Sequence, residues 1–115
     1  MVDKTHNVFL IGLMAVGKTT VGRLLADELA LPFFDSDRVV EEKAGADIAW
    51  IFDVEGEAGF RERECQAIDE LTLRDGVVLA TGGGVVLRAE NRHNLSTRGV
   101  VVFLDSPIEK LVERT

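Results

Sequence analysis

The feature that most constrains the fold is a glycine-rich segment between a short apolar run and an amphipathic one. Residues 12–19, GLMAVGKT, fit the pattern G-x-x-x-x-G-K-[ST]. An apolar run over residues 8–11 precedes them, and Val21, Leu24, Leu25 and Leu29 follow at helical spacing. A strand, a loop and a helix in this order can fold backbone N–H groups around phosphate oxygens. The sequence therefore predicts a phosphate-binding loop.

Each position of this loop has its own expected task. Lys18 would reach the outer phosphates of a nucleotide as a point charge, and the Thr19 hydroxyl would coordinate Mg²⁺. The alternative is a glycine-punctuated strand-to-helix turn with an incidental lysine. The predicted nucleotide contacts are Ala15, Val16, Gly17, Lys18, Thr19 and Thr20.

Three further apolar runs, over residues 33–34 with their flanks, 77–80 and 100–104, predict strands that are covered on both faces. Helical patterns lie between them, one of which ends near Asp75-Gly76 and has Phe60, Ala67, Ile68 and Leu71 on one face. This alternation predicts an α/β fold with a parallel sheet and helices on both faces, as one domain over residues 1–115. Residues 37–59, interrupted at Gly45 and Gly56, are predicted to be a substrate-binding insertion. The alternative is extra helical cover over the sheet.

Composition excludes several classes of protein. Thirteen Lys and Arg against 20 Asp and Glu give a net charge of −7, which argues against binding to nucleic acid or to an anionic membrane surface. No apolar run approaches the length of a membrane span, and the N-terminus lacks a signal-peptide pattern. The one cysteine, Cys65, cannot form an internal disulfide, and we read it as packing on a helix face. We therefore expect a cytoplasmic protein.

Two carboxylates follow the second predicted strand. Asp35 and Asp37 stand at its carboxyl end, which in a parallel sheet opens into the same crevice as the phosphate loop. One could orient Mg²⁺ through water, while the other accepts hydrogen bonds from substrate hydroxyls and takes a proton. The alternative is that one of them only caps the following helix.

Two more features lie within reach of this crevice. Arg61 and Glu64 are three residues apart on a predicted helix, so an arginine held by a carboxylate could bind an anionic ligand; a surface ion pair is the alternative. Gly82 and Gly83 lie in the run Thr81-Gly82-Gly83-Gly84 after the third strand. Such a run lets backbone N–H groups approach a ligand, and a flexible turn is the alternative. Trp50 is read as packing within the insertion.

Taken together, these residues resemble the shikimate kinase family over essentially the whole chain. The similarity rests on the phosphate loop, on Asp35-Ser36-Asp37, on Phe60-Arg61 with Glu64, and on the glycine triplet. It implies the P-loop fold of the nucleoside monophosphate kinases, with strand order 2-3-1-4 here and the family's fifth strand missing. It also implies phosphorylation of the 3-hydroxyl of shikimate by ATP with Mg²⁺, by a monomer.

The resemblance further implies a role for each site residue. Asp37 would hold the shikimate hydroxyls and act as the base, while Arg61, steadied by Glu64, would bind the shikimate carboxylate. The backbone around Gly82 and Gly83 would contact the same substrate. Asp35 would join Thr19 in the magnesium shell, Lys18 would neutralise the transferring phosphoryl group, and Arg114 would lie against the adenine.

The sequence departs from the family pattern at two places. Ala15 stands where the family usually has glycine, and the chain stops at Thr115, before the family's lid, its second carboxylate-binding arginine and its final helix. A missing transition-state arginine can cost about 10³-fold in phosphoryl transfer, so we expect weak turnover or none. The alternatives are another small-molecule kinase of this fold, such as one acting on gluconate, or a nucleotide-binding fragment that transfers no phosphate.

Overall fold

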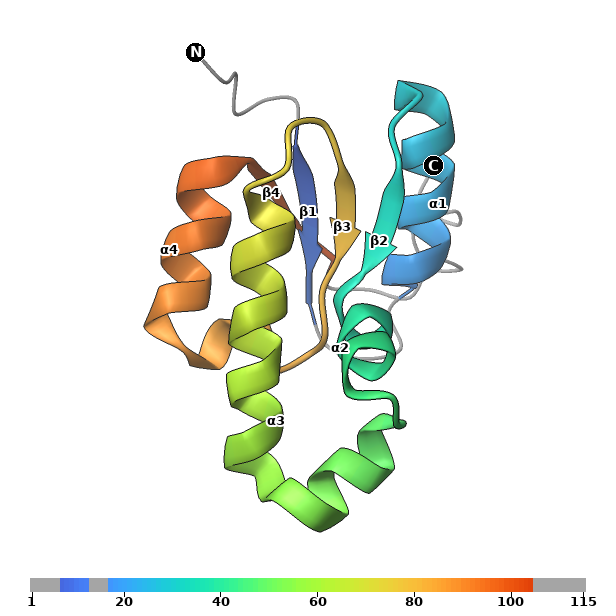
Figure 1. The fold of residues 1–115 in the computed structure, drawn as a ribbon. Helices are drawn as coiled ribbons and strands as arrows, with labels where there is room; N and C mark the ends of the chain where they lie inside the picture. Colours follow the sequence, from blue (N-terminus) through green and yellow to red (C-terminus); the bar gives the residue numbers. More distant parts are fainter. Residues whose placement is uncertain (1–6, 13–16, 105–115) are drawn as a thin grey trace.

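Four parallel strands form one sheet in the computed structural model, which describes residues 7–12 and 17–104. They are β1 (Val8–Ile11), β2 (Phe33–Asp35), β3 (Val78–Ala80) and β4 (Val100–Phe103), in the order β2-β3-β1-β4 (Figure 1). Asp35 pairs with Ala80, and Leu10 pairs with both Ala80 and Val102. The predicted strand order is confirmed. Because all the strands are parallel, their carboxyl ends meet at one edge of the sheet.

The helices lie on both faces of the sheet, as predicted. Helix α1 (Lys18–Leu29) connects β1 to β2, while α2 (Ser36–Ala44) and α3 (Ile48–Thr72) connect β2 to β3. A short 3₁₀ turn, η2 (Val85–Leu87), and α4 (Ala89–Arg98) lead to β4. The connection from β1 to β2 crosses the sheet in one direction. The connections from β2 to β3 and from β3 to β4 cross it in the other direction. Right-handed crossovers therefore place α1 on one face and α3 with α4 on the other (Figure 1).

The packing of α1 differs from the predicted apolar face. Leu24 and Leu29 are 60% and 46% exposed, whereas the buried residues of the helix are Lys18, Gly22 and Ala26. A Cβ on Gly22 would lie 2.4 Å from the Phe33 ring, so the absence of a side chain lets the helix approach the sheet. The expectation that the leucines form the buried face was wrong, because small residues make the close contact.

The core has two clusters. The larger lies between the sheet and the α3–α4 layer and consists of Phe9, Ile68, Leu71, Val77, Leu79, Val85 and Leu95. The smaller joins α2 to α3 and consists of Val40, Ile51, Phe60 and Ala67. The four residues predicted on one face of α3 therefore divide between the clusters. Ile68 and Leu71 lie in the larger cluster, and Phe60 and Ala67 lie in the smaller one.

Helix α3 bends at Gly56, whose φ of 75° and ψ of 177° interrupt the helical backbone. Arg63 spans the bend and forms two hydrogen bonds of 2.8 Å to the Glu55 carboxylate. The helix ends at Thr72, earlier than predicted, and Trp50 is half exposed, so the expectation that it packs inside the insertion was wrong. No helix in the described part of the chain combines the length and the apolar character that crossing a membrane requires.

Candidate active site

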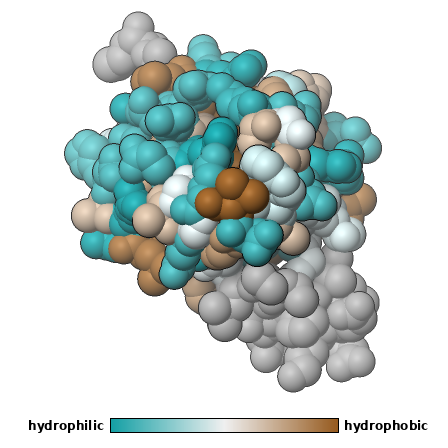
Figure 2. All heavy atoms as spheres, turned by 60° about the horizontal axis from the view of Figure 1, so that its bottom comes forward, coloured by the Kyte–Doolittle hydropathy of each residue, from teal (hydrophilic) through white to brown (hydrophobic). Residues whose placement is uncertain are grey.

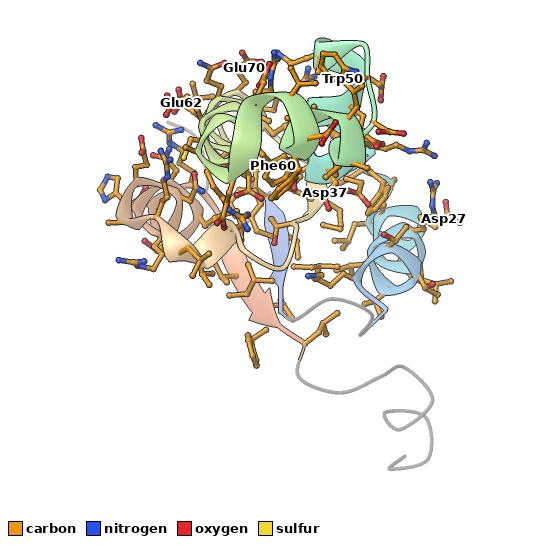
Figure 3. The ribbon with its side chains drawn as sticks, turned by 90° about the horizontal axis from the view of Figure 1, so that it is seen from below. Asp27, Asp37, Trp50, Phe60, Glu62 and Glu70 are labelled. Atoms are coloured by element: carbon orange, nitrogen blue, oxygen red, sulfur yellow. The ribbon has the colours of Figure 1, made fainter. Side chains whose placement is uncertain are left out.

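The predicted site residues gather where β1, β2 and β3 end. Asp35 is the last residue of β2, Thr81 and Gly82 directly follow β3, and Gly12 follows β1. Figure 3 looks onto this edge and shows Asp37 and Phe60 turned toward its centre, with Trp50 and Glu62 at the rim. The surface seen from this side is mainly hydrophilic around a compact apolar patch (Figure 2).

Two adjacent hollows, each of about 140 Å³, open at this edge. The first has Lys18, Thr19 and Asp35 in its wall, and the second has Arg61 and Glu64. Both hollows share Asp37, Gly82 and Gly83. The second also has three apolar side chains that the sequence analysis did not assign to the site, Ile48, Phe52 and Phe60. Asp37 therefore stands on the boundary between a polar hollow that contains Lys18 and a mixed apolar and charged one.

Lys18 is almost buried at the first turn of α1. Its Nζ donates a hydrogen bond of 2.5 Å to the carbonyl oxygen of Gly12, the first residue of the loop. Burial lowers the pKa of Lys18, and the nearby carboxylates of Asp37 and Asp35 oppose that shift. Gly17, immediately before it, has a φ of 86°, a conformation that glycine adopts without strain. The lysine amine is thus held at Gly12, within a wall that contains two carboxylates.

Asp35 makes two kinds of contact, one of which is the helix cap that the sequence left as an alternative. Its Oδ1 accepts hydrogen bonds from the backbone N–H groups of Asp37 and Arg38, which caps α2. Its Oδ2 accepts a hydrogen bond of 3.1 Å from the Thr19 hydroxyl. One oxygen is therefore used for the cap, and the other faces the loop. Thr19 and Asp35 together present oxygen atoms to the first hollow.

Asp37 has a raised pKa of about 6, against an ordinary value of 3.8. Burial is the largest cause, followed by the negative charges of Asp35 and Glu64, while Lys18 acts in the opposite direction. A carboxylate with this pKa is ionised at neutral pH and is a stronger base than an ordinary aspartate. The geometry therefore gives Asp37 the properties of a proton acceptor.

Arg61 is held by a buried carboxylate. Its Nη1 donates a hydrogen bond of 3.0 Å to Oε1 of Glu64, which is 1% exposed, and Glu57 accepts a longer one from Nη2. Burial raises the pKa of Glu64, and the hydrogen bond from Arg61 limits that rise. The alternative of a surface ion pair is wrong for this pair, since Glu64 is fully enclosed. The guanidinium is fixed in the wall of the second hollow.

The glycine triplet makes room for charged side chains of the protein itself. A Cβ on Gly82 would lie 2.7 Å from Oδ1 of Asp37, and one on Gly84 would lie 2.5 Å from the Arg61 guanidinium. Real Cβ atoms essentially never lie this close to another heavy atom. The sequence suggested glycines here so that a ligand could approach the backbone. The structure adds a second reason, which is that side chains at these positions would collide with Asp37 and Arg61. The turn packs directly against both charged groups.

Other predicted contacts lie elsewhere. Ala15, Val16 and Arg114 are outside the described residues. Thr20 is exposed on α1 and is not in the wall of either hollow. Cys65 lies on α3, buried as predicted, with its Sγ 3.9 Å from Nη1 of Arg88.

This combination defines a class of protein: a P-loop kinase of the nucleoside monophosphate kinase type, with a parallel sheet and helices on both faces. A family model described as shikimate kinase matches residues 14–115. The chain belongs to the shikimate kinase family.

Individual relatives agree with this assignment. A shikimate kinase of Actinobacillus succinogenes is 60% identical over 110 residues, which is 96% of this chain and 63% of that protein. A solved structure, shikimate kinase from Acinetobacter baumannii in complex with shikimate, is 53% identical with a TM-score of 0.87, and the match covers 95% of this chain and 61% of that one. The chain thus spans less than two thirds of the length of these relatives.

A kinase of the alternative kind is more distant. A gluconokinase from Sinorhizobium meliloti is 18% identical with a TM-score of 0.56, over 99% of this chain and 65% of that one. At this level of identity the similarity concerns the fold alone. The gluconate alternative is not favoured.

Proposed function

We propose that this chain carries the donor and acceptor sites of an enzyme that transfers the γ-phosphoryl group of ATP to the 3-hydroxyl of shikimate. One observation carries the proposal: Asp37 borders both hollows, with Lys18, Thr19 and Asp35 on one side and Arg61 on the other. A base between a phosphate site and a carboxylate site is the arrangement that this transfer requires. Membership of the shikimate kinase family supports the choice of substrate.

The first hollow is the proposed donor side. Lys18, now bonded to Gly12, would turn to the outer phosphates of ATP and offset the negative charge of the transferring group. Gly17 and the N-terminus of α1 would offer backbone N–H groups to the same phosphates. Ala15, Val16 and Thr20 remain predicted contacts of ATP, as does Arg114 of its adenine.

The residues of the first hollow fit Mg²⁺ bound chiefly by the nucleotide. Thr19 and Asp35 supply oxygen atoms 3.1 Å apart, and Mg²⁺ usually takes one or two protein ligands with phosphates and water for the rest. Among residues 7–12 and 17–104, no group of three or more His, Cys, Asp or Glu side chains could hold a metal ion without the nucleotide. Thr19 and Asp35 would hold the bound Mg²⁺, whose positive charge would offset the negative charge of the phosphates.

The second hollow is the proposed acceptor side. The Arg61 guanidinium, held by Glu64, would bind the shikimate carboxylate as a planar fork, and Phe52 and Phe60 would cover the ring. Residues 37–59, which supply Ile48 and Phe52, would act as the substrate-binding insertion. The backbone of Gly82 and Gly83 would contact the substrate between the two hollows.

In the proposed transfer, Asp37 is the base that accepts the hydroxyl proton. The 3-hydroxyl oxygen attacks the γ-phosphorus, the bond from that phosphorus to the β–γ bridging oxygen breaks, and the hydroxyl proton passes to the Asp37 carboxylate. The products are ADP and shikimate 3-phosphate. From the sequence and the family resemblance, we also propose that the enzyme is a cytoplasmic monomer.

The test is shikimate-stimulated ADP release from MgATP by the 115-residue chain, with a Lys18→Ala variant as the blank and calorimetric titration of shikimate beside it. Saturable shikimate binding, with ADP release that disappears in the blank, is the expected result. Binding of nucleotide alone, or stimulation by gluconate in place of shikimate, would contradict the proposal.

A further inference from the structure

Ser36, the middle residue of Asp35-Ser36-Asp37, has no part in the function proposed above, yet it is completely buried. Its Oγ accepts a hydrogen bond of 3.1 Å from the backbone N–H of Gly82. The two residues are 46 positions apart in the chain and belong to the two strand ends that form the site. Burying a hydroxyl costs free energy unless a hydrogen bond compensates, so this contact stabilises the buried position of Ser36.

The contact continues the hydrogen-bond ladder of the sheet beyond its last strand residue. Val78 donates its N–H to the carbonyl of Pro32. In a parallel ladder the donor and the acceptor each advance by two residues, so the N–H of Gly82 comes to the place where the carbonyl of Ser36 would accept it. The backbone turns into α2 at Ser36, and the Ser36 hydroxyl takes the place that a strand carbonyl would occupy.

The residues on either side of this contact are those of the site. Asp37 follows Ser36 in the first turn of α2, and its carboxylate packs against the Cα of Gly82. Gly82 also accepts a hydrogen bond from the N–H of Val85, whose own carbonyl accepts one from the buried Asn91. Among the described residues, none accepts a hydrogen bond from the N–H of Gly83. The turn is thus held on both sides. The N–H of Gly84 likewise has no acceptor among the described residues, and the N–H of Gly83, in the wall of both hollows, can face a ligand.

We propose that Ser36 is a positioning residue: its hydroxyl fixes the Gly82-Gly83 turn against the first turn of α2. The base Asp37 and the free N–H of Gly83 are then held at one separation, suited to a polyhydroxylated acid in the second hollow. This inference rests on the proposed function for the identity of that acid, which is shikimate. Loss of the hydroxyl leaves Gly82 N–H without its partner and lets the turn move relative to Asp37.

The test compares three variants of the chain. Ser36→Ala removes the hydroxyl, Ser36→Thr retains an Oγ at the same position, and Thr72→Val removes a different buried hydroxyl, at the end of α3 and away from both hollows. Hydrogen exchange of the Gly82 amide reports the contact directly. Calorimetric titrations with shikimate and with MgATP report what the contact positions, and circular dichroism verifies folding.

In Ser36→Ala, we expect the Gly82 amide to exchange at least about tenfold faster and shikimate affinity to fall about tenfold, with MgATP affinity within about twofold. Ser36→Thr should restore both, and Thr72→Val should change neither. Unchanged exchange of Gly82 in Ser36→Ala would overturn the contact. Equal losses of shikimate and MgATP affinity, or the same losses in Thr72→Val, would overturn the positioning role. Failure of the unsubstituted chain to bind shikimate would instead overturn the proposed function, while the exchange comparison still judges the contact.

Discussion

The guanidinium of Arg61 occupies the space where a side chain on Gly84 would begin, since a Cβ there would lie 2.5 Å from both Nη1 and Nη2. Gly84 has a φ of −96°, so its backbone conformation does not itself require glycine. The requirement comes from Arg61, whose Nη1 is bonded to the buried Glu64. Gly84 therefore determines how far the guanidinium projects into the second hollow.

Substitution of Gly84 by alanine should displace the Arg61 guanidinium without preventing folding. The end of an arginine side chain can move, so the new methyl group pushes it away from its bond to Glu64. A displacement of about 1 Å at a binding group can reduce kcat/KM by about 10²-fold. We expect Gly84→Ala to reduce shikimate affinity by about 10–100-fold, measured by titration, with little change in Tm.

The matched control is Gly45→Asn. Gly45 ends α2 with a φ of 70°, and nothing lies within 4 Å of the position of its Cβ. Asparagine tolerates this left-handed conformation better than other residues with side chains. Shikimate affinity should be unchanged in the control. A Gly84→Ala variant that binds shikimate as tightly as the parent chain would show that Arg61 is not the group that contacts the substrate.

Substitution of Asp35 by asparagine separates its cap of α2 from its proposed role beside Mg²⁺. An amide oxygen still accepts hydrogen bonds from the N–H groups of Asp37 and Arg38, and Asn and Asp are comparable helix caps. The amide carries no negative charge, however, so it is a poorer partner for Mg²⁺ beside Thr19. The free energy of unfolding of Asp35→Asn should therefore lie within about 0.5 kcal/mol of that of the parent chain. The variant should need several-fold more Mg²⁺ to bind ATP.

Asp47→Asn is the control for Asp35. Asp47 caps α3 through a hydrogen bond of 2.8 Å from the N–H of Trp50 and is in the wall of neither hollow. The same chemical change at that cap should leave the Mg²⁺ dependence of ATP binding unaltered. If both variants shift the Mg²⁺ titration equally, or if neither does, Asp35 acts as a cap alone.

The raised pKa of Asp37 predicts opposite pH effects on activity and stability. Activity should rise with pH through about 6, because the base must be ionised. Between 3.8 and about 6 the folded chain binds more protons at this group than the unfolded chain, so its contribution to the free energy of unfolding falls as pH rises. The ionised aspartate thus reduces stability at neutral pH.

Asp37→Asn tests both effects. The variant should lose shikimate-dependent ADP release at every pH, while its free energy of unfolding at pH 7.5 should exceed that of the parent chain by about 1 kcal/mol. Denaturant titrations at pH 4 and pH 7.5 measure the difference, which should nearly vanish at the lower pH. If the difference in free energy of unfolding between Asp37→Asn and the parent chain is the same at both pH values, the pKa of Asp37 is not raised.

The sequence predicted the sheet and most of the site because those features depend on local patterns. Continuous apolar runs located the four strands, and the sequence of strand, loop and helix indicated the phosphate loop. The prediction that the strands are covered on both faces was wrong for β4, whose four residues are all exposed because it lies at the edge of the described sheet. Helix α4 was not predicted from the sequence, because its buried residues are only Asn91 and Leu95 and no apolar stripe marks it. Small residues likewise concealed the buried face of α1, where Gly22 makes the closest contact.

Contacts between distant segments were beyond the sequence. Nothing near Gly84 in the chain indicates that Arg61 lies against it, and nothing near Ser36 indicates its bond to Gly82. The two alternatives for Asp35 could not be separated either, because capping depends on local spacing and the bond from Thr19 depends on the sheet order. Such relationships follow from the strand order and cannot be read from spacing.

Asn7, which no sequence pattern indicated, connects three segments at the amino end of the sheet. Its side chain is 1% exposed and makes four hydrogen bonds with the backbone. The Nδ2 donates to the carbonyls of Arg74 and Arg98, while the Oδ1 accepts from the N–H groups of Gly76 and Val77. The turn after α3 and the end of α4 are therefore both joined to the start of β1.

Asn7→Ala should be among the most destabilising single substitutions in the chain. It removes the side-chain partner of the N–H groups of Gly76 and Val77 and of the carbonyls of Arg74 and Arg98, which should reduce the free energy of unfolding by about 2–4 kcal/mol in denaturant titrations. Hydrogen exchange at Gly76 and Val77 should accelerate most. Asn94→Ala, which removes one exposed contact of 3.4 Å with Asp69, should cost less than about 0.5 kcal/mol. Similar losses in the two variants would mean that the Asn7 bonds do not hold the amino end of the sheet together.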